Sequence, residues 1–492
     1  MAAPAHSGIS FNAQFNSGSP RRRRDGCTEC RRKKVKCDLQ KPVCSRCIRF
    51  PRQCCYDLSI IALKPQRPRT PRRNSREISS PVPKSSPSSS KPMSLIYQPP
   101  INPSPFLSSN ESRFLMHIFG TQTSKMLFPA APDFFLQRMI GAAMETPHLL
   151  YALLASACSH HSRLIKDSTP NPKVTCLKYT NMAISSLRET LQDANQSLKA
   201  ETITTAMALC TNDVCNGNMH VWRTHLRGVL RLLAACLQHQ REAYSTDDPF
   251  LLSLAKWFKT MDIIAALSGI DGECIHDPEN GPLDRGSILG NDYIDDICGY
   301  SIDLIPYMVR ISQMVRSQRL DNMPADTSPG ELASLRVIAE VEALESDIMS
   351  LVEKPLSGPS YQEGEAFSTE LRSTHLAFVH SALLHLHRRV QLLPIDHIKV
   401  RIDIKNILDA IQNINLTSTA NILILWPVFS AGCETTSPSE RDMIRERMGI
   451  MQNFGMGNFT RTRELLEKYW ESGSDLRWDE YFARLGLELV LF

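Results

Sequence analysis

The stretch CTECRRKKVKCDLQKPVCSRCIRFPRQCCY, residues 27–56, decides the fold of the N-terminal part of this 492-residue chain. Its cysteines repeat the spacing Cys-x2-Cys-x6-Cys twice, with six residues between the two copies. The six cysteines are Cys27, Cys30, Cys37, Cys44, Cys47 and Cys54. A structural zinc ion takes four ligands, so two ions would need eight thiolates unless two sulfurs bridge both metals. The pattern therefore predicts a binuclear zinc cluster.

This stretch resembles the fungal Zn2Cys6 binuclear-cluster DNA-binding domain. The resemblance implies two Zn2+ ions per cluster, with Cys27 and Cys44 bridging them. It also implies that the other four cysteines each bind a single ion: Cys30 and Cys37 the first, Cys47 and Cys54 the second. Zinc would then be a scaffold that holds the fold, with no catalytic role.

The identity of the sixth ligand is ambiguous, because Cys55 directly follows Cys54 at the end of the second copy of the repeat. We choose Cys54, which preserves the internal repeat and places the aromatic Tyr56 two residues later. Pro51 departs from the family pattern, and we expect it to end a second short helix after Phe50 because proline cannot donate a helical hydrogen bond.

Two other interpretations of the cysteines are weaker. A disulfide framework would call for a secreted protein, but residues 1–20 lack the basic start and apolar core of a signal peptide, and we expect a disordered tail there. A metallothionein-like or purely structural zinc module would fit the spacing. It would not explain the charge that surrounds the cysteines.

That charge is strongly basic and confined to one end of the chain. Residues 21–52 carry 13 Lys or Arg against three acidic residues, whereas the whole chain has a net charge of +5 and residues 92–492 sum to −11. Such an asymmetry is typical of a nucleic-acid-binding arm joined to an acidic body. We therefore interpret residues 21–56 as a domain that binds double-stranded DNA.

The basic residues between the cysteines are the candidate DNA contacts. Residues 31–36 are expected to form a short helix that zinc holds through the flanking cysteines. By resemblance, this helix enters the major groove and reads a CGG-type triplet, with Lys33 and Lys34 near the base edges, where lysine suits guanine O6 and N7. The remaining basic residues are expected to contact phosphates, or else to be solvated charges: Arg31, Arg32, Lys36, Arg46 and Arg49.

Beyond Tyr56 the composition changes abruptly. Residues 57–105 hold 11 prolines and 11 serines, which predicts a disordered or polyproline-like linker. The prolines exclude a sustained coiled coil, so the chain either binds DNA as a monomer or forms a homodimer through its helical domain. The basic runs 21–24 and 67–76 resemble nuclear-import sequences, and we expect the protein in the nucleus.

Residues 106–492 have the composition and periodicity of a large all-α domain. After Thr146 and Pro147, which suit the first positions of a helix, apolar residues recur at helical spacing up to Ile165. Similar stripes cover residues 179–187 and 222–233, the second following a turn at 216–218. Alternating β-type runs are few.

Three stretches of this region resemble the helical regulatory domain called fungal-specific transcription factor domain 2. They are LCTNDVCNGNMHVWRTHLRGVLRLL (209–233), DICGYSIDLIPYMVRIS (296–312) and ILILWPVFSAGCE (422–434). Their motifs are mainly apolar helix faces. The resemblance implies a domain that regulates output by ligand sensing, inhibition, dimerisation or activation through the transcription machinery or co-regulators.

The sequence carries little that an enzyme would need. His375, His380, His385 and His387 cannot form a shared metal site on one helix face, since 375 and 380 point about 140° apart, and we expect exposed or hydrogen-bonded histidines. The glycines at 455 and 457 form a loop without the third glycine of a dinucleotide site.

The apolar runs of the chain are too short to span a membrane. Residues 478–489 mix acidic and bulky apolar residues as activation segments do, but we expect them to pack in the core.

These observations predict a nuclear, sequence-specific DNA-binding regulator of RNA polymerase II genes, acting on one pathway or gene cluster. The alternative is a ligand-sensing regulator whose helical domain is primarily a small-molecule receptor. An apolar pocket in the helical domain would favour that alternative.

Overall fold

A computed structural model of the protein divides the chain into two compact units, residues 1–96 and residues 97–492. It describes residues 30, 33, 35, 37–38, 44–49, 104–165, 172–217, 222–242, 248–269, 273–276, 293–321, 331–356, 365–487 and 489–491. The predicted tail lies outside the described residues, as does the predicted linker apart from its last two residues.

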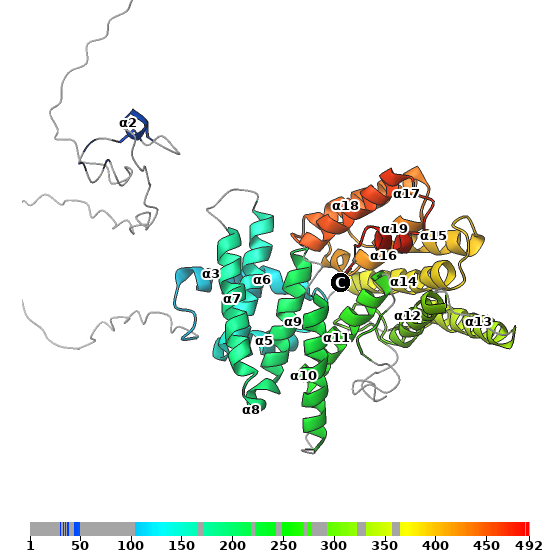
Figure 1. Ribbon diagram of the computed structural model, residues 1–492, viewed down its shortest axis with the longest axis horizontal. Helices are drawn as coiled ribbons and strands as arrows, with labels where there is room; N and C mark the ends of the chain where they lie inside the picture. Colours follow the sequence, from blue (N-terminus) through cyan, green and yellow to red (C-terminus); the bar gives the residue numbers. More distant parts are fainter. Residues whose placement is uncertain are drawn as a thin grey trace, which may run out of the picture. The chain divides into compact units, whose positions relative to one another are not determined.

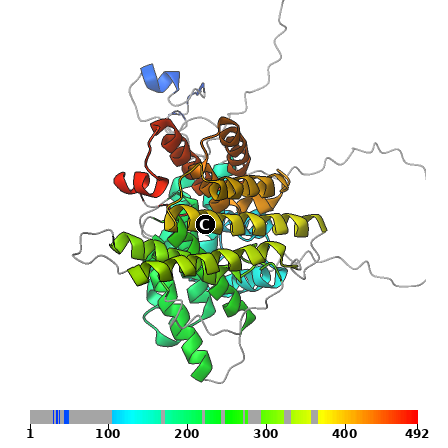
Figure 2. The ribbon, with the colours of Figure 1, turned by 90° about the vertical axis from the view of Figure 1, so that its right-hand side faces the viewer.

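Every regular element of the described residues is a helix, so the predicted combination of a small cysteine-rich unit and a large all-α region is confirmed (Figures 1 and 2). The first unit contains α2 (Ser45–Arg49). The first half of the second unit contains α3 (Asn110–Ile118), η2 (Phe119–Thr123), α4 (Ser124–Leu127), α5 (Asp133–Glu145), α6 (Pro147–Leu164), α7 (Pro172–Thr190), α8 (Ala194–Ser197), α9 (Ala200–Cys215), α10 (Trp222–Glu242) and α11 (Pro249–Ser268). The second half contains α12 (Leu304–Asp321), α13 (Glu331–Glu353), α14 (Glu365–His385), η3 (Leu386–Val390), α15 (Ile398–Gln412), η4 (Thr419–Ile422), α16 (Leu425–Glu434), α17 (Pro438–Gln452), α18 (Gly457–Ser472) and α19 (Trp478–Arg484).

The three helices predicted from apolar periodicity are confirmed. α6 begins at Pro147 with Thr146 in extended conformation at its N-cap, where a proline loses no helical hydrogen bond. α7 and α10 cover the other two stripes, and the buried side chains of α10 include Trp222 and Leu226. The turn before α10 contains Gly217, whose φ of 77° lies in the left-handed region that glycine adopts without strain.

The helical unit contains two large apolar clusters, and α11 contributes to both. One cluster gathers side chains of α3 to α11, and the other gathers side chains of α11 to α19 together with Cys215 of α9. Along α11, Phe258 belongs to the first cluster and Ile263 to the second. In Figure 1, α11 accordingly lies between the cyan and green helices and the yellow and red ones. Burial of α11 in both clusters joins the two halves.

Two further predictions concern the C-terminal part of this unit. The predicted loop is confirmed at Gly455, which lies between α17 and α18 with a φ of 74°, but Gly457 is the first residue of α18. In α19, Trp478 and Phe482 are buried, so this C-terminal segment packs into the core. Among the described residues, we find no helix whose length and apolar character would let it cross a membrane.

Candidate zinc cluster and nucleic-acid interface

Three of the predicted zinc ligands converge in the N-terminal unit. The sulfur atoms of Cys30, Cys37 and Cys44 all lie within 4.8 Å of one another, and Cys30 Sγ is 3.8 Å from Cys44 Sγ. That separation is far longer than the ~2.05 Å of a disulfide bond. Two sulfurs bound at ~2.3 Å to one tetrahedral zinc ion would lie about 3.8 Å apart. The three thiols therefore fit a shared zinc ion.

The thiols are also shielded from solvent. Cys30, Cys44 and Cys47 are 2%, 0% and 4% exposed, and Val35 packs against them. Thiolates are the ligands that zinc prefers in closed structural sites, and the three converging donors among the described residues are all cysteine sulfurs. The described residues therefore fit a zinc cluster that organises the fold.

Short-range hydrogen bonds shape the segment between the cysteines. Asp38 Oδ2 accepts a hydrogen bond from the backbone N–H of Ser45 at 3.1 Å, which caps the first turn of α2. The N–H of Cys47 donates to the carbonyl of Cys44 at 2.9 Å, and that of Val35 donates to the carbonyl of Cys30 at 3.0 Å. A five-residue helix such as α2 is too short to be stable alone, so it depends on these contacts and on metal binding.

Basic side chains surround the buried sulfurs. Arg46 and Arg49 lie on α2 and are exposed, as is Lys33 in the turn after Cys30. α2 ends at Arg49, close to where Pro51 was predicted to stop it. Seven of the predicted site residues lie outside the described residues: Cys27, Cys54, Arg31, Arg32, Lys34, Lys36 and the alternative ligand Cys55. Within the predicted helix 31–36 the structure describes Lys33, which lies in a turn, and Val35, which lies in no regular element, so the helix is not found at these two positions; the other four lie outside the described residues.

Comparison with known proteins decides the family. Residues 113–492 match the fungal specific transcription factor domain, and residues 25–60 match the fungal Zn(2)-Cys(6) binuclear cluster domain. The chain belongs to the fungal Zn2Cys6 transcription factors. Members of this family carry two zinc ions in a cluster that binds DNA, and they are transcription factors, which are typically non-enzymatic and act in the nucleus.

Three curated relatives of this Zn2Cys6 factor agree with the assignment. A Zn(2)-C6 fungal-type transcription factor of Aspergillus fumigatus is 26% identical over 219 residues, which cover 42% of this chain and 49% of the relative. The lysine biosynthesis regulatory protein of Saccharomyces cerevisiae is 53% identical over 36 residues, 7% of this chain and 5% of the relative. An uncharacterized transcriptional regulatory protein of Schizosaccharomyces pombe is 44% identical over 50 residues, 9% of each chain.

The match thus spans about half the length of the first relative and less than a tenth of the other two. No solved structure matches the chain.

The four histidines of the helical unit are hydrogen-bonded as predicted, but the expectation that they could be exposed is wrong. His375, His380, His385 and His387 are all buried, between 1% and 6% exposed. Burial lowers the pKa of His375 to about 4 and that of His385 well below its usual value, so both rings are neutral at pH 7. None of the four joins a group of three metal-ligating side chains among the described residues.

Their partners come from helices distant in the sequence. His387 Nδ1 lies 2.7 Å from Asp403 on α15, and His380 Nδ1 lies 3.4 Å from the other oxygen of the same carboxylate. His385 Nε2 lies 3.0 Å from Ser430 Oγ on α16. These contacts tie α14 and η3 to their neighbours, which is a structural role.

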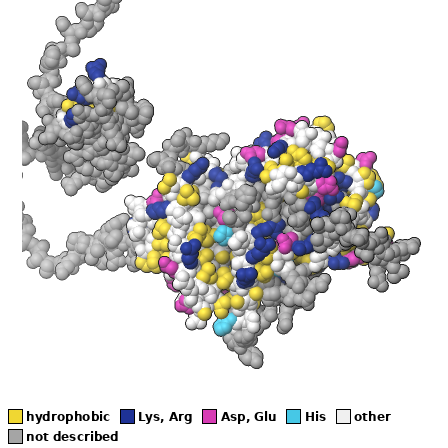
Figure 3. Space-filling model, in the orientation of Figure 1, with side chains coloured by type: hydrophobic (Ala, Val, Ile, Leu, Met, Phe, Trp, Pro, Cys, Tyr) yellow, Lys and Arg dark blue, Asp and Glu magenta, His cyan; other side chains and the backbone are white. Residues whose placement is uncertain are grey.

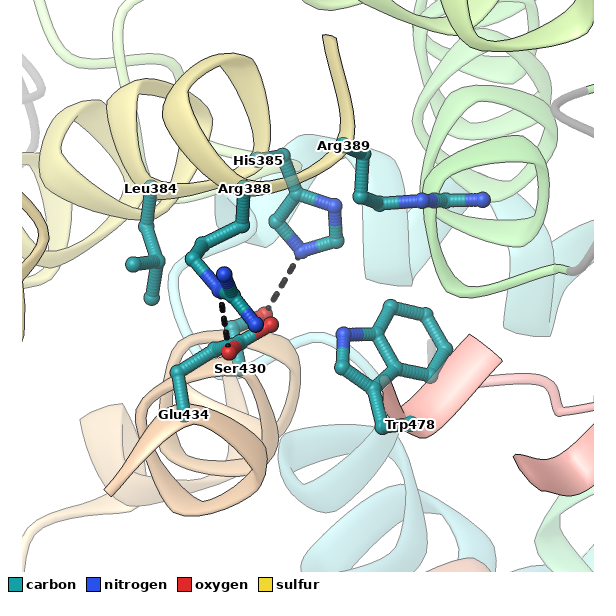
Figure 4. A pocket seen from close by; sticks show the side chains of 7 residues that line it. All are labelled: Leu384, His385, Arg388, Arg389, Ser430, Glu434 and Trp478. Atoms are coloured by element: carbon teal, nitrogen blue, oxygen red, sulfur yellow. Dashed lines mark hydrogen bonds and ion pairs between the residues drawn. The ribbon is translucent and has the colours of Figure 1, made fainter. Parts of the chain in front are cut away.

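A small pocket beside His385 bears on the receptor alternative (Figure 4). On one side of the pocket, Arg388 Nε donates a hydrogen bond to Glu434 Oε2 at 2.6 Å. On the other side, the Arg389 guanidinium lies 5.1 Å from the centroid of the Trp478 ring. Burial raises the pKa of Glu434 to about 7 although Arg388 opposes the shift. The lining groups are mostly polar and pair with one another, unlike the apolar lining typical of a small-molecule site.

The surface of the helical unit gives no sign of a second nucleic-acid-binding face in the view of Figure 3. Lys and Arg side chains are interspersed there with Asp and Glu. Mixed charge of this kind is typical of an ordinary soluble surface. Along the sequence, positive charge is concentrated in residues 21–52.

Proposed function

We propose that this chain is a sequence-specific regulator of RNA polymerase II genes that reads CGG-type triplets through its zinc cluster, and that it serves one pathway or gene cluster. The observation that carries the proposal is the placement of exposed Lys33, Arg46 and Arg49 around thiols that are buried and close enough to share zinc. Fixed basic side chains on a metal-held scaffold suit binding to a duplex.

Within this proposal the basic residues have two different tasks. Lys33 and Lys34 reach guanine O6 and N7 in the major groove, which gives sequence preference. Arg31, Arg32 and Lys36 contact phosphates together with the two arginines of α2, and these contacts fix the position of the cluster without reading bases. The zinc ligands in this proposal are the six cysteines of the repeat, with Cys54 as the sixth.

The two tasks are separable by titrating variants against a CGG-containing duplex and a scrambled duplex. Lys34→Ala should lose about 1–3 kcal/mol of binding on the CGG duplex and much less on the scrambled one. Arg46→Ala should weaken both duplexes alike and reduce the salt slope by about 1. Lys405→Ala, on the exposed surface of α15, is the matched control and should change neither. Equal losses on both duplexes for Lys34→Ala would contradict base reading.

The prolines exclude a coiled coil after the cluster, which leaves a monomer or a dimer formed by the helical unit, and we infer the dimer. The outer face of α7 supports this inference. Val174, Leu177 and Ile184 lie there at helical spacing and are 58%, 60% and 36% exposed. Sedimentation of the full chain should show a dimer that Leu177→Asp weakens, whereas a monomer at all concentrations would contradict it.

A further inference from the structure

Two cysteines outside the zinc cluster lie against each other in the helical unit. Cys176 Sγ on α7 is 3.0 Å from Cys158 Sγ on α6. A disulfide bond is ~2.05 Å long, so a movement of about 1 Å would join the sulfurs. Cys158 is 6% exposed, whereas Cys176 is only half-buried and can be reached by a small solute.

The position of Cys176 is fixed by contacts on both sides of it. Thr175 Oγ1 and Tyr179 OH donate hydrogen bonds to the two carboxylate oxygens of Glu111 on α3, at 3.3 Å and 3.2 Å. Tyr179 and Ala183 are buried, at positions three and seven residues beyond Cys176. These contacts set the rotation of α7 about its axis, so that Cys176 faces α6.

The surroundings also favour the reactive form of Cys176. The contact with the Cys158 thiol lowers the pKa of Cys176, and Ser159 and the Arg163 guanidinium act in the same direction against the effect of burial. Arg163 is itself held in place, since it donates to Asn216 Oδ1 and to the Gly455 carbonyl. The thiolate is the nucleophilic form of cysteine, so a half-buried, stabilised thiolate is the one that reacts.

We propose that Cys158 and Cys176 form a peroxide-sensitive dithiol that closes to a disulfide between α6 and α7. The Cys176 thiolate attacks one oxygen of hydrogen peroxide, the O–O bond breaks, and the products are a sulfenic acid and, after protonation of the leaving hydroxide, one water. The Cys158 sulfur then attacks the sulfenic sulfur, the S–O bond breaks, and the hydroxyl leaves with the thiol proton as a second water. The two thiols lose two electrons in total, and the peroxide gains them.

The disulfide would have a physical consequence for the regulatory domain. It would join two helices whose linked residues are 18 positions apart, which removes freedom from the unfolded chain. Disulfides in reducing compartments are usually transient and redox-sensing, and this pair fits that type. The modification belongs to the helical unit and is independent of the cluster that binds DNA.

Peptide mapping of the full-length, zinc-loaded protein tests the proposal. After brief treatment with hydrogen peroxide and alkylation, a non-reducing tryptic digest should yield peptide 174–178 linked to peptide 139–163, with the mass of two hydrogens lost. Thermal unfolding of the oxidised protein should shift upward by roughly 3–6 °C, and dithiothreitol should reverse the shift. Cys176→Ser should abolish both effects.

Cys210→Ser is the matched control, because Cys210 is fully buried and burial raises its pKa. This variant should retain the linked peptides and the thermal shift. Two outcomes would overturn the proposal: separately alkylated peptides under conditions that oxidise other thiols, or conversion of Cys176 to a sulfinic acid without cross-linking. Zinc content followed in parallel identifies damage to the cluster as a separate event.

Discussion

Asp479 on α19 is a buried carboxylate that forms ion pairs with three arginines. Its replacement tests how much these ion pairs stabilise the regulatory domain. Arg477 Nε donates to Asp479 Oδ1 at 2.6 Å, and Arg319 Nη2 and Arg389 Nε each lie 3.3 Å from Oδ2. The side chain of Asp479 is 0% exposed and that of Arg389 is 1% exposed. Asp479→Ala would therefore leave the buried charge of Arg389 without this counter-charge.

Breaking a buried ion pair by removing one partner typically costs about 3–5 kcal/mol. Arg389 would keep its hydrogen bonds to the carbonyls of Leu267, at 2.7 Å, and Gly269, at 3.0 Å, which argues for the lower part of that range. We therefore expect Asp479→Ala to lower the free energy of unfolding by about 3 kcal/mol, seen as a shift of roughly 1 M in the urea midpoint.

The loss of stability caused by Asp479→Ala should become smaller at low pH. Burial alone would raise the pKa of Asp479, but Arg389, Arg477 and Arg319 hold it well below its usual range. A carboxyl group whose pKa is lowered by folding stabilises the protein above its unfolded pKa of about 3.9, and the stabilisation is lost as the pH falls further. The difference between the wild type and Asp479→Ala should thus be full at pH 7 and should shrink below about pH 4.

Tryptophan fluorescence during urea unfolding of the full chain is a suitable assay, because all five tryptophans lie between residues 222 and 478. Lys405→Ala is the control: Lys405 and Asp409 form an ion pair whose side chains are 72% and 54% exposed, and its loss should cost less than about 0.5 kcal/mol. A loss below about 1 kcal/mol for Asp479→Ala, or one that does not change with pH, would refute the reasoning.

Three further predictions concern the cluster and the core. Cys44→Ser removes an inferred bridging thiolate, so zinc analysis should find at most one ion per chain; two ions would contradict a bridging role. Cys54→Ser should lose zinc while Cys55→Ser keeps two ions, and the reverse result would make Cys55 the sixth ligand. In α16, a Cβ at Gly432 would lie 2.6 Å from Leu466 Cδ2, so Gly432→Ala should lower the stability by about 1–3 kcal/mol in thermal unfolding; an unchanged midpoint would contradict the packing.

Features with local causes could be predicted from the sequence. The spacing of the cysteines predicted the cluster because the coordination number of zinc is fixed. α6 was predictable because its apolar stripe follows Thr146 and Pro147, whose backbone preferences suit the start of a helix. By contrast, the capping box of α3 was missed, although the Ser109 and Ser112 side chains each accept a hydrogen bond from the other's backbone N–H.

Features that depend on distant partners could not be predicted. Periodicity identifies the apolar face of a helix but not the helix that this face meets, so the division into two clusters sharing α11 was not foreseen. The same limit explains the histidines. His380 and His387 can be buried because each forms a hydrogen bond with the carboxylate of Asp403, which lies on another helix. No local sequence pattern reveals that contact. Cys158 and Cys176 likewise meet only because α6 and α7 pack together.

The central claim is that two zinc ions, bridged by cysteine sulfurs, hold the short basic segment in the shape that binds a duplex. Removal of the zinc tests this claim most directly. The purified full chain should contain two zinc ions per molecule, and a CGG-containing duplex should bind it in a fluorescence anisotropy titration. A chelator should abolish that binding and added zinc should restore it, while the tryptophan fluorescence of the helical unit stays unchanged. Fewer than two ions in the active protein, or undiminished affinity after the metal is removed, would contradict the account.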